Sequence, residues 1–223
     1  MSLSERFKEH MEEDKEPMVS QPFSEAELTS LPQSLPKDLI GFFETYGRCQ
    51  MKQGILQTCH PNDFRSILAL IFGADADFSH KNCNAFAYSA FGEIYFWHEG
   101  YGVGYLKLYD GRVFSRNLVK GIAEGAKIEL GIYSPFYGDF DEYDYLDLQG
   151  KALFKKAVKK CGMPEIGECF GFVPVLALGG IPDITCIKRL SAPEHFAIAC
   201  QTIEYNLIHV RDYGDSVIVR PIG

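Results

Sequence analysis

The chain has 223 residues, and its composition of 46% apolar and 23% charged residues is that of a folded globular protein of one large or two small domains. Its first twenty residues lack the apolar centre of a secretory signal, and no apolar run approaches the ~20 residues of a membrane helix, which favours a cytoplasmic protein without membrane contact. Net charge is −8, and residues 1–150 hold 23 acidic against 13 basic residues, which disfavours direct nucleic-acid binding and favours a basic protein partner.

The N-terminal third is predicted to be mainly helical. Residues 4–14 form a short charged helix, and the proline-containing residues 17–36 form a connector with one helical turn at residues 24–28. Pro36 suits a first helical position, and the apolar residues up to Tyr46 fall on one face, so a helix is expected to end before Gly47.

The middle of the chain changes from a helical to a strand period. A strand is predicted at residues 54–59 and a helix at residues 61–72, where apolar residues recur at helical spacing. Residues 84–114 then alternate with period two between glycine-containing turns, which predicts an antiparallel meander.

The next stretch combines two helices with an acidic aromatic loop. Residues 117–131 could form a helix weakened by glycines, and residues 151–161 form a basic helix. Between them lies the loop SPFYGDFDEYDY, residues 134–145.

The last third is predicted to contain the most apolar strand. Residues 168–180, ECFGFVPVLALGG, suit a buried core strand in which Pro174 takes an edge or bulge position. Residues 184–190 form another strand, Ser191 and Glu194 have capping-box spacing for a last helix over 191–206, and residues 216–220 form a terminal strand.

Few residues have the spacing of a reactive site. Seven cysteines without a C-x-x-C pair predict reduced, mostly buried thiols and no zinc site. His60 follows Cys59, but it stands where a helix N-cap belongs, and the glycines at 100, 102 and 104 suit hairpins better than a phosphate loop. The acidic run at 139–147 lacks the glycine of a calcium loop, so we expect no catalytic residue, metal or cofactor.

Three blocks of sequence carry a family resemblance. They are LPKDLIGFFETYG with the following PNDF, SAFGEIYFW, and the run from GKALFKKAVKKCG through ECFGFVPVLALGG to EHFAIACQ. Together, over roughly residues 5–207, they resemble a GAD-like domain followed by the small C-terminal domain of bacterial immunity proteins that neutralise DNase effectors of the type VI secretion system.

The resemblance implies a fold, a division of the chain and a function. The fold would be α+β, an antiparallel meander flanked by helices (SUKH/GAD-like) with a smaller packed α+β C-terminal part, divided into residues 1–147 and 148–223. The function would be stoichiometric occlusion of a cognate toxin, a basic nuclease, rather than catalysis. The name GAD refers to glutamate decarboxylase, but no pyridoxal phosphate site is recognisable in the sequence. The interpretation as an enzyme therefore rests on the name alone.

The candidate binding residues come from the acidic aromatic loop and the meander. Carboxylates interleaved with aromatic anchors suit a docking surface, although a solvated loop is the alternative. For Trp97, core packing is favoured over binding. A second functional hypothesis is a module that holds a small molecule or peptide in a groove beside the meander, with Trp97 and Tyr101 lining the groove. The predicted partner-binding residues are Tyr137, Asp139, Phe140, Asp141, Glu142, Tyr143, Asp144, Trp97 and Tyr101.

Overall fold

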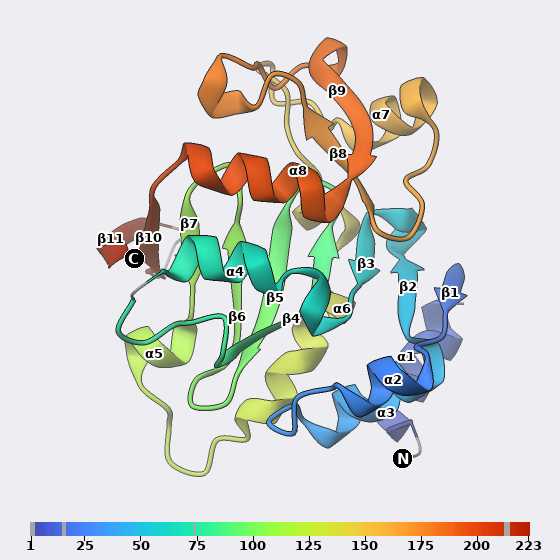
Figure 1. The fold of residues 1–223 in the computed structure, drawn as a ribbon, viewed down its shortest axis with the longest axis vertical. Helices are drawn as coiled ribbons and strands as arrows, with labels where there is room; N and C mark the ends of the chain where they lie inside the picture. Colours follow the sequence, from blue (N-terminus) through green and yellow to red (C-terminus); the bar gives the residue numbers. More distant parts are fainter. Residues whose placement is uncertain (1–2, 15–16, 74, 212–214) are drawn as a thin grey trace.

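A nine-stranded sheet forms the centre of the computed structural model, which describes residues 3–14, 17–73, 75–211 and 215–223 (Figure 1). Strands β1 to β7 follow one another antiparallel in chain order, β10 then adds parallel to β7, and β11 closes the sheet antiparallel to β10. The strands are β1 (Val19–Gln21), β2 (Arg48–Met51), β3 (Leu56–Thr58), β4 (Cys83–Ser89), β5 (Glu93–His98), β6 (Gly102–Lys107), β7 (Arg112–Phe114), β10 (Tyr205–Val210) and β11 (Ser216–Ile222).

Helices cover both faces of this sheet, which confirms the predicted α+β fold. Figure 1 shows α4 and α8 lying across one face of the sheet. Helices α1, α3 and α6 contribute to the core on the other face. The α-helices are α1 (Glu5–Asp14), α2 (Glu25–Thr29), α3 (Lys37–Tyr46), α4 (Arg65–Phe72), α5 (Arg116–Lys120), α6 (Ser134–Tyr137), α7 (Phe154–Cys161) and α8 (Ala192–Ala199).

Strand β5 shows how the sheet separates two cores. Side chains alternate between the faces of a strand, so Ile94 and Phe96 join the core under α4 and α8, whereas Tyr95 and Trp97 join the core under α1 and α3. All four side chains are at most 8% exposed. The meander predicted from the period-two pattern is therefore confirmed, with both of its faces buried along β5.

A two-stranded sheet of β8 (Glu168–Phe172) and β9 (Ile187–Ser191) packs through aromatic rings against the turns at one end of the central strands of the main sheet. Phe172 lies 5.3 Å from Tyr109 and 5.2 Å from Tyr145 between ring centroids, and Phe170 lies 5.8 Å from Phe91. The backbone N–H of Phe170 also donates to the Ala90 carbonyl at 2.8 Å. These contacts fix the C-terminal part against the turn between β4 and β5.

Three predictions about local structure are wrong. The run at 168–180 is a strand only as far as Phe172, because Pro174 has no N–H for a ladder, and the chain continues as a short 3-10 turn, Leu176–Leu178, with Leu178 62% exposed. Ser191 stands at the N-cap of α8, as predicted, but its side chain makes no capping hydrogen bond, and its backbone pairs with Glu168 in the small sheet. The helix predicted for 117–131 ends at Lys120.

Strand β10 is the main element that the sequence did not predict. Its first residues, including Tyr205, fall within the stretch predicted as the last helix, yet β10 brings the C-terminal segment into the main sheet beside β7. Because β10 and β11 extend the sheet built by residues 19–114, the C-terminal segment contributes to both sheets. The division at residue 147 stays a prediction.

The cysteines agree with the prediction of reduced thiols. No disulfide joins any of the seven, and five of them are buried. Among the described residues no helix is both long and apolar enough to cross a bilayer, and no cluster of three or more His, Cys, Asp or Glu side chains is arranged to hold a metal.

An arginine on the terminal strand ties β11 to the loop before β4. The Arg220 guanidinium donates to Asp77 Oδ2 at 2.6 Å and to both carboxylate oxygens of Asp75. Burial raises the pKa of Asp75, but the donors from Arg220 and from the N–H groups of Phe78 and Asp77 outweigh burial and lower this pKa to about 2. The Asp75 side chain is only 1% exposed, so it depends on these partners.

We predict that Arg220→Gln lowers the free energy of unfolding by about 2 kcal/mol at pH 7, because a buried carboxylate loses its charged donor. Because the folded-state pKa of Asp75 is depressed, its carboxylate stabilises the folded protein at pH values above its ordinary pKa of 3.8. That stabilisation is lost as the pH falls toward the folded-state pKa of about 2. The difference between variant and wild type should therefore shrink over that range in urea titrations. An equal loss in Arg211→Gln, an exposed arginine nearby, would contradict this explanation.

Candidate functional site

The acidic aromatic segment, residues 134–145, forms two short turns between the start of α7 and the face of β5 that carries Tyr95. Helix α6 is followed by the 3-10 turn Phe140–Tyr143. The Tyr143 ring lies 6.4 Å from Tyr95 on β5, and the Phe140 ring lies 5.5 Å from Phe154 on α7. The segment is thus packed on both sides.

Two of its residues point inward and hold it in place. Tyr143 is 2% exposed, and its hydroxyl donates to the Pro135 carbonyl at 2.7 Å. Asp144 Oδ1 accepts from the backbone N–H of Leu153 at 3.0 Å and of Phe154 at 2.8 Å, where α7 begins. Burial raises the pKa of Asp144, although these backbone donors favour its charged form. Tyr143 and Asp144 therefore support the segment rather than present a surface.

Pro135 and Phe136 are buried as well, whereas four residues predicted to bind a partner are exposed. Asp139, Asp141 and Glu142 share one surface with Phe140, and Tyr137, which is 49% exposed, packs against helix α1. Phe140 is half-buried, with the Lys155 ammonium 5.7 Å from its ring centroid. Of the seven segment residues predicted to bind a partner, these five are accessible.

Trp97 and Tyr101 lie apart from the segment's exposed carboxylates. Trp97 is 3% exposed, and its indole N–H donates to the Ser34 carbonyl at 2.8 Å, which is the core packing that the sequence favoured. The Tyr101 hydroxyl donates to Asp77 at 3.1 Å, and its ring stacks on His98. In this conformation Trp97 cannot line an open groove.

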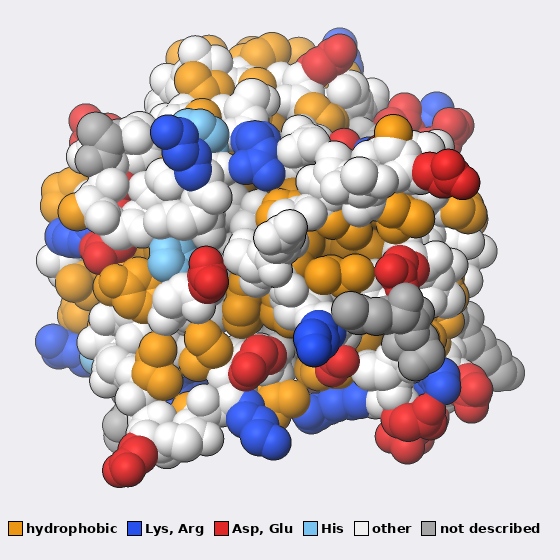
Figure 2. All heavy atoms as spheres, turned by 60° about the horizontal axis from the view of Figure 1, so that its bottom comes forward, with side chains coloured by type: hydrophobic (Ala, Val, Ile, Leu, Met, Phe, Trp, Pro, Cys, Tyr) orange, Lys and Arg blue, Asp and Glu red, His pale blue; other side chains and the backbone are white. Residues whose placement is uncertain are grey.

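Surface charge is not gathered into one large field on the face drawn in Figure 2. Basic and acidic side chains are interspersed there, with hydrophobic side chains visible between them. The net charge of −8 steers partners weakly at long range, so local arrangements such as the three carboxylates of the segment decide where a basic partner docks.

A hollow of about 390 Å³ lies between the segment and the face of β5 and β6 that carries Tyr95 and Tyr105. We call it the acidic hollow. It is lined by Glu93, Tyr95, Tyr105, Lys107, Ser134, Glu142 and Tyr143. Glu93 and Tyr105 were not predicted as site residues, although strand alternation places Glu93 on the same face as Tyr95 and Trp97.

Glu93 is a partly shielded carboxyl at the centre of the acidic hollow. Burial raises the pKa of Glu93 even though Lys107 Nζ lies 3.4 Å from its Oε2 and the Tyr95 hydroxyl donates to its Oε1. Burial also raises the pKa of Tyr105 to about 12, so this tyrosine stays neutral at neutral pH. A carboxyl among tyrosine rings can accept an ammonium or guanidinium group by charge-assisted hydrogen bonds and cation–π contact.

The other chemical candidates have structural roles. His60 is the N-cap of the turn Pro61–Asp63, where its Nδ1 accepts from the Asn62 N–H at 3.1 Å, as predicted. Burial raises the pKa of the Cys59 thiol well above its ordinary value, which leaves it unreactive. A Cβ at Gly104 would lie 2.5 Å from the Phe96 ring, so close packing within the sheet requires that glycine.

Comparisons with known proteins match two regions of the chain to protein families. The family described as GAD-like domain matches residues 5–108, and the family described as T6SS immunity protein Tdi1, C-terminal, matches residues 133–202. The chain combines a GAD-like domain with a Tdi1-type C-terminal domain. The second match supports a place among the immunity proteins of type VI secretion.

A solved structure has the same fold over nearly the whole chain. The crystal structure of Atu4351 from Agrobacterium tumefaciens is 27% identical, covers 97% of this chain and 98% of that one, and superposes with a TM-score of 0.87. A search of curated proteins gives no match.

The acidic hollow lies where the two matched regions meet. Glu93, Tyr95 and Tyr105 belong to the GAD-like domain, whereas Glu142 and Tyr143 belong to the Tdi1-type domain. The hollow therefore depends on both domains being packed together.

We predict that Gly138→Ala lowers the free energy of unfolding by about 2 kcal/mol and loosens the segment. A Cβ at Gly138 would lie 2.2 Å from the Tyr143 hydroxyl and 2.7 Å from the Glu142 carboxylate, so the inward anchor must move. Urea unfolding and proteolysis of residues 137–145 measure the effect. Gly100→Ala is the control, because its Cβ approaches no atom closer than 3.3 Å, and an equal effect there would refute the explanation.

We predict that Glu93→Gln becomes more stable relative to wild type as the pH rises from about 4 to 7. A raised folded-state pKa means that the protonated carboxyl favours folding at low pH and that this stability is lost as the pH rises through the folded-state value. Gln cannot ionise and avoids that loss. Glu99→Gln, in an exposed turn of the same hairpin, is the control for removal of a carboxylate, and a flat profile for Glu93→Gln would count against burial as the cause.

Proposed function

We propose that this protein is an immunity protein that binds a cognate type VI secretion toxin, a basic nuclease, and neutralises it by stoichiometric occlusion. The observation that carries the proposal is the set of exposed carboxylates, Asp139, Asp141 and Glu142, beside the acidic hollow. The match to the Tdi1 C-terminal family over the residues that contain them supports it further.

The proposed mechanism follows from the charge of a nuclease. Its DNA-binding surface must be basic to hold phosphate, so it complements the carboxylates of the segment and is steered toward them. A lysine or arginine of the toxin would enter the acidic hollow beside Glu93, with Tyr105 supplying apolar contact in its lining. The bound segment would then exclude DNA from the same surface.

The surroundings of the reactive side chains support binding rather than catalysis. Cys59 and His60 are 1% and 2% exposed, and His60 is engaged as a cap. Glu93 is a single shielded carboxyl whose nearest partners are Tyr95 and Lys107. We propose that the protein acts without turnover, at a ratio of one inhibitor to one toxin.

A direct test is co-purification with the toxin encoded beside this gene, followed by a DNase assay. We expect a complex at nanomolar concentrations and complete inhibition at a one-to-one ratio. No binding at micromolar concentration, or inhibition at a ratio far below one, would remove the proposal.

We predict that Asp139→Asn, Asp141→Asn and Glu142→Gln combined slow association with the toxin at least about tenfold at low salt and flatten its salt dependence. Asp144 is left intact because it holds the start of α7. Stopped-flow fluorescence measures the rates. The control replaces Glu12, Glu13 and Glu25, also exposed, by Gln, and equal slowing there would place the interface elsewhere.

A further inference from the structure

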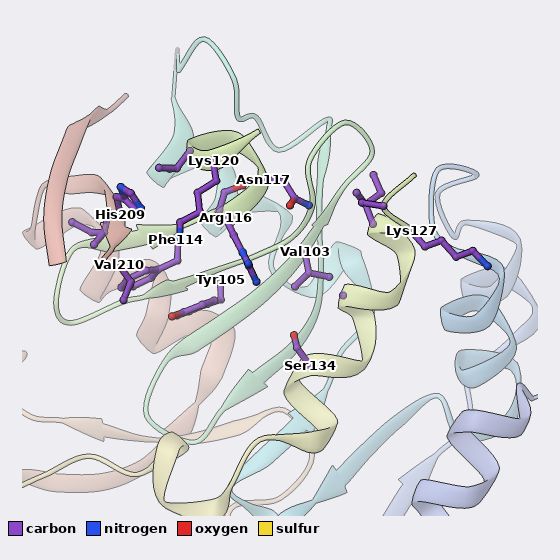
Figure 3. A pocket seen from close by; sticks show the side chains of 16 residues that line it. Val103, Tyr105, Phe114, Arg116, Asn117, Lys120, Lys127, Ser134, His209 and Val210 are labelled. Atoms are coloured by element: carbon purple, nitrogen blue, oxygen red, sulfur yellow. The ribbon is translucent and has the colours of Figure 1, made fainter. Parts of the chain in front are cut away.

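A second and larger cavity lies next to the acidic hollow, on the same face of the main sheet. Its volume is about 560 Å³, within the range of small-molecule sites. We call it the basic cavity, because Arg116, Lys120 and Lys127 are among the residues that line it (Figure 3). Tyr105 and Ser134 line both the basic cavity and the acidic hollow, so the two are neighbours.

The floor of the basic cavity is flat and apolar. Strand alternation puts Val103 and Tyr105 of β6 and Phe114 of β7 on the same face, and the Tyr105 and Phe114 rings stack at 4.5 Å with 13° between their planes. Val210 of β10 is 45% exposed at the edge. Such a floor suits a flat apolar body laid against the two rings.

Arg116 supplies charge above this floor. Figure 3 shows its guanidinium reaching toward the region between Tyr105 and Val103, whereas the Lys127 ammonium extends away from the other lining side chains. Among the described residues the Arg116 side chain makes no hydrogen bond or ion pair, although residues 1–150 hold more acidic than basic residues. Glu124 and Glu129 are exposed in the same stretch but do not line the cavity.

His209 also lines the cavity wall, but its ring does not offer a partner to a ligand. Its Nε2 is buried and makes no hydrogen bond in the part of the chain that the structure describes, so it is not accessible from the cavity. Recognition of an anion therefore depends on Arg116.

We propose that the basic cavity binds a small organic anion in which a carboxylate is joined to a flat apolar body. The carboxylate pairs with the Arg116 guanidinium, whose fork matches two oxygens, and the apolar body lies on Tyr105 and Phe114. The proposal does not depend on the proposed function, although the basic cavity shares Tyr105 and Ser134 with the acidic hollow. It also differs from the groove expected beside Trp97.

The experiment measures binding of 2-naphthoate to the full chain by calorimetry and ligand-detected NMR. We expect saturable binding with a Kd of about 1 mM or tighter. The neutral 2-naphthalenemethanol and inorganic phosphate, which each lack one half of the recognised chemistry, should bind at least about tenfold more weakly. No saturable binding of 2-naphthoate, or equal binding of either comparison compound, would overturn the proposal.

Matched variants locate the site. Arg116→Gln should weaken 2-naphthoate binding at least about tenfold, and because the Arg116 side chain is exposed the variant should fold normally. Lys127→Gln removes the same charge from the same cavity rim but should change the Kd less than about twofold, since its ammonium points away. Equal effects of the two substitutions would show general charge attraction and would refute the assigned role of Arg116.

Discussion

The candidate binding surface depends on the carboxylate of Asp144 and the hydroxyl of Tyr143, which turn inward and hold a segment that is otherwise acidic and exposed. One oxygen of Asp144 accepts the N–H groups that begin α7, and Tyr143 bonds back to the Pro135 carbonyl. Mutually repelling carboxylates would otherwise favour an open loop. With these anchors, Asp139, Asp141 and Glu142 are presented on a short turn whose ordering does not have to occur on binding.

The two domains supply different parts of the same surface. The meander of the GAD-like domain provides a rigid wall with Glu93 and Tyr105, and the Tdi1-type domain lays the acidic segment against it. Ring contacts of Phe91 with Phe170 and Phe172 hold the two domains together. A change that separates the domains would therefore remove the acidic hollow as well as destabilise the fold.

Much of this arrangement could be predicted from the sequence, because the regular elements have regular periods. The helices at α3 and α4 and the meander follow from apolar spacing and from glycines at their ends. Strand β10 was not predicted because its first residues continue the apolar pattern of the preceding helix. The strand prediction beyond Phe172 is wrong because apolar composition alone does not show where a proline leaves the ladder.

The site itself was predictable only in part. Composition marked the acidic aromatic segment, but its two turns are too short to show a period that would tell Tyr143, which is buried, from Tyr137, which is half exposed. Glu93 could be assigned to a face by alternation, yet its raised pKa arises from residues about fifty positions later that cover it. Arg116 and His209 line one cavity only because β10 pairs with β7, a long-range contact that no local pattern encodes.

Amide hydrogen exchange of the whole chain, measured with and without the cognate toxin, tests the central claim most directly. The structure predicts slower exchange on binding in residues 137–145 and at the adjoining ends of β5 and β6, with no change in α4 and α8 on the opposite face of the sheet. Protection confined to α4 and α8, with residues 137–145 unaffected, would contradict it.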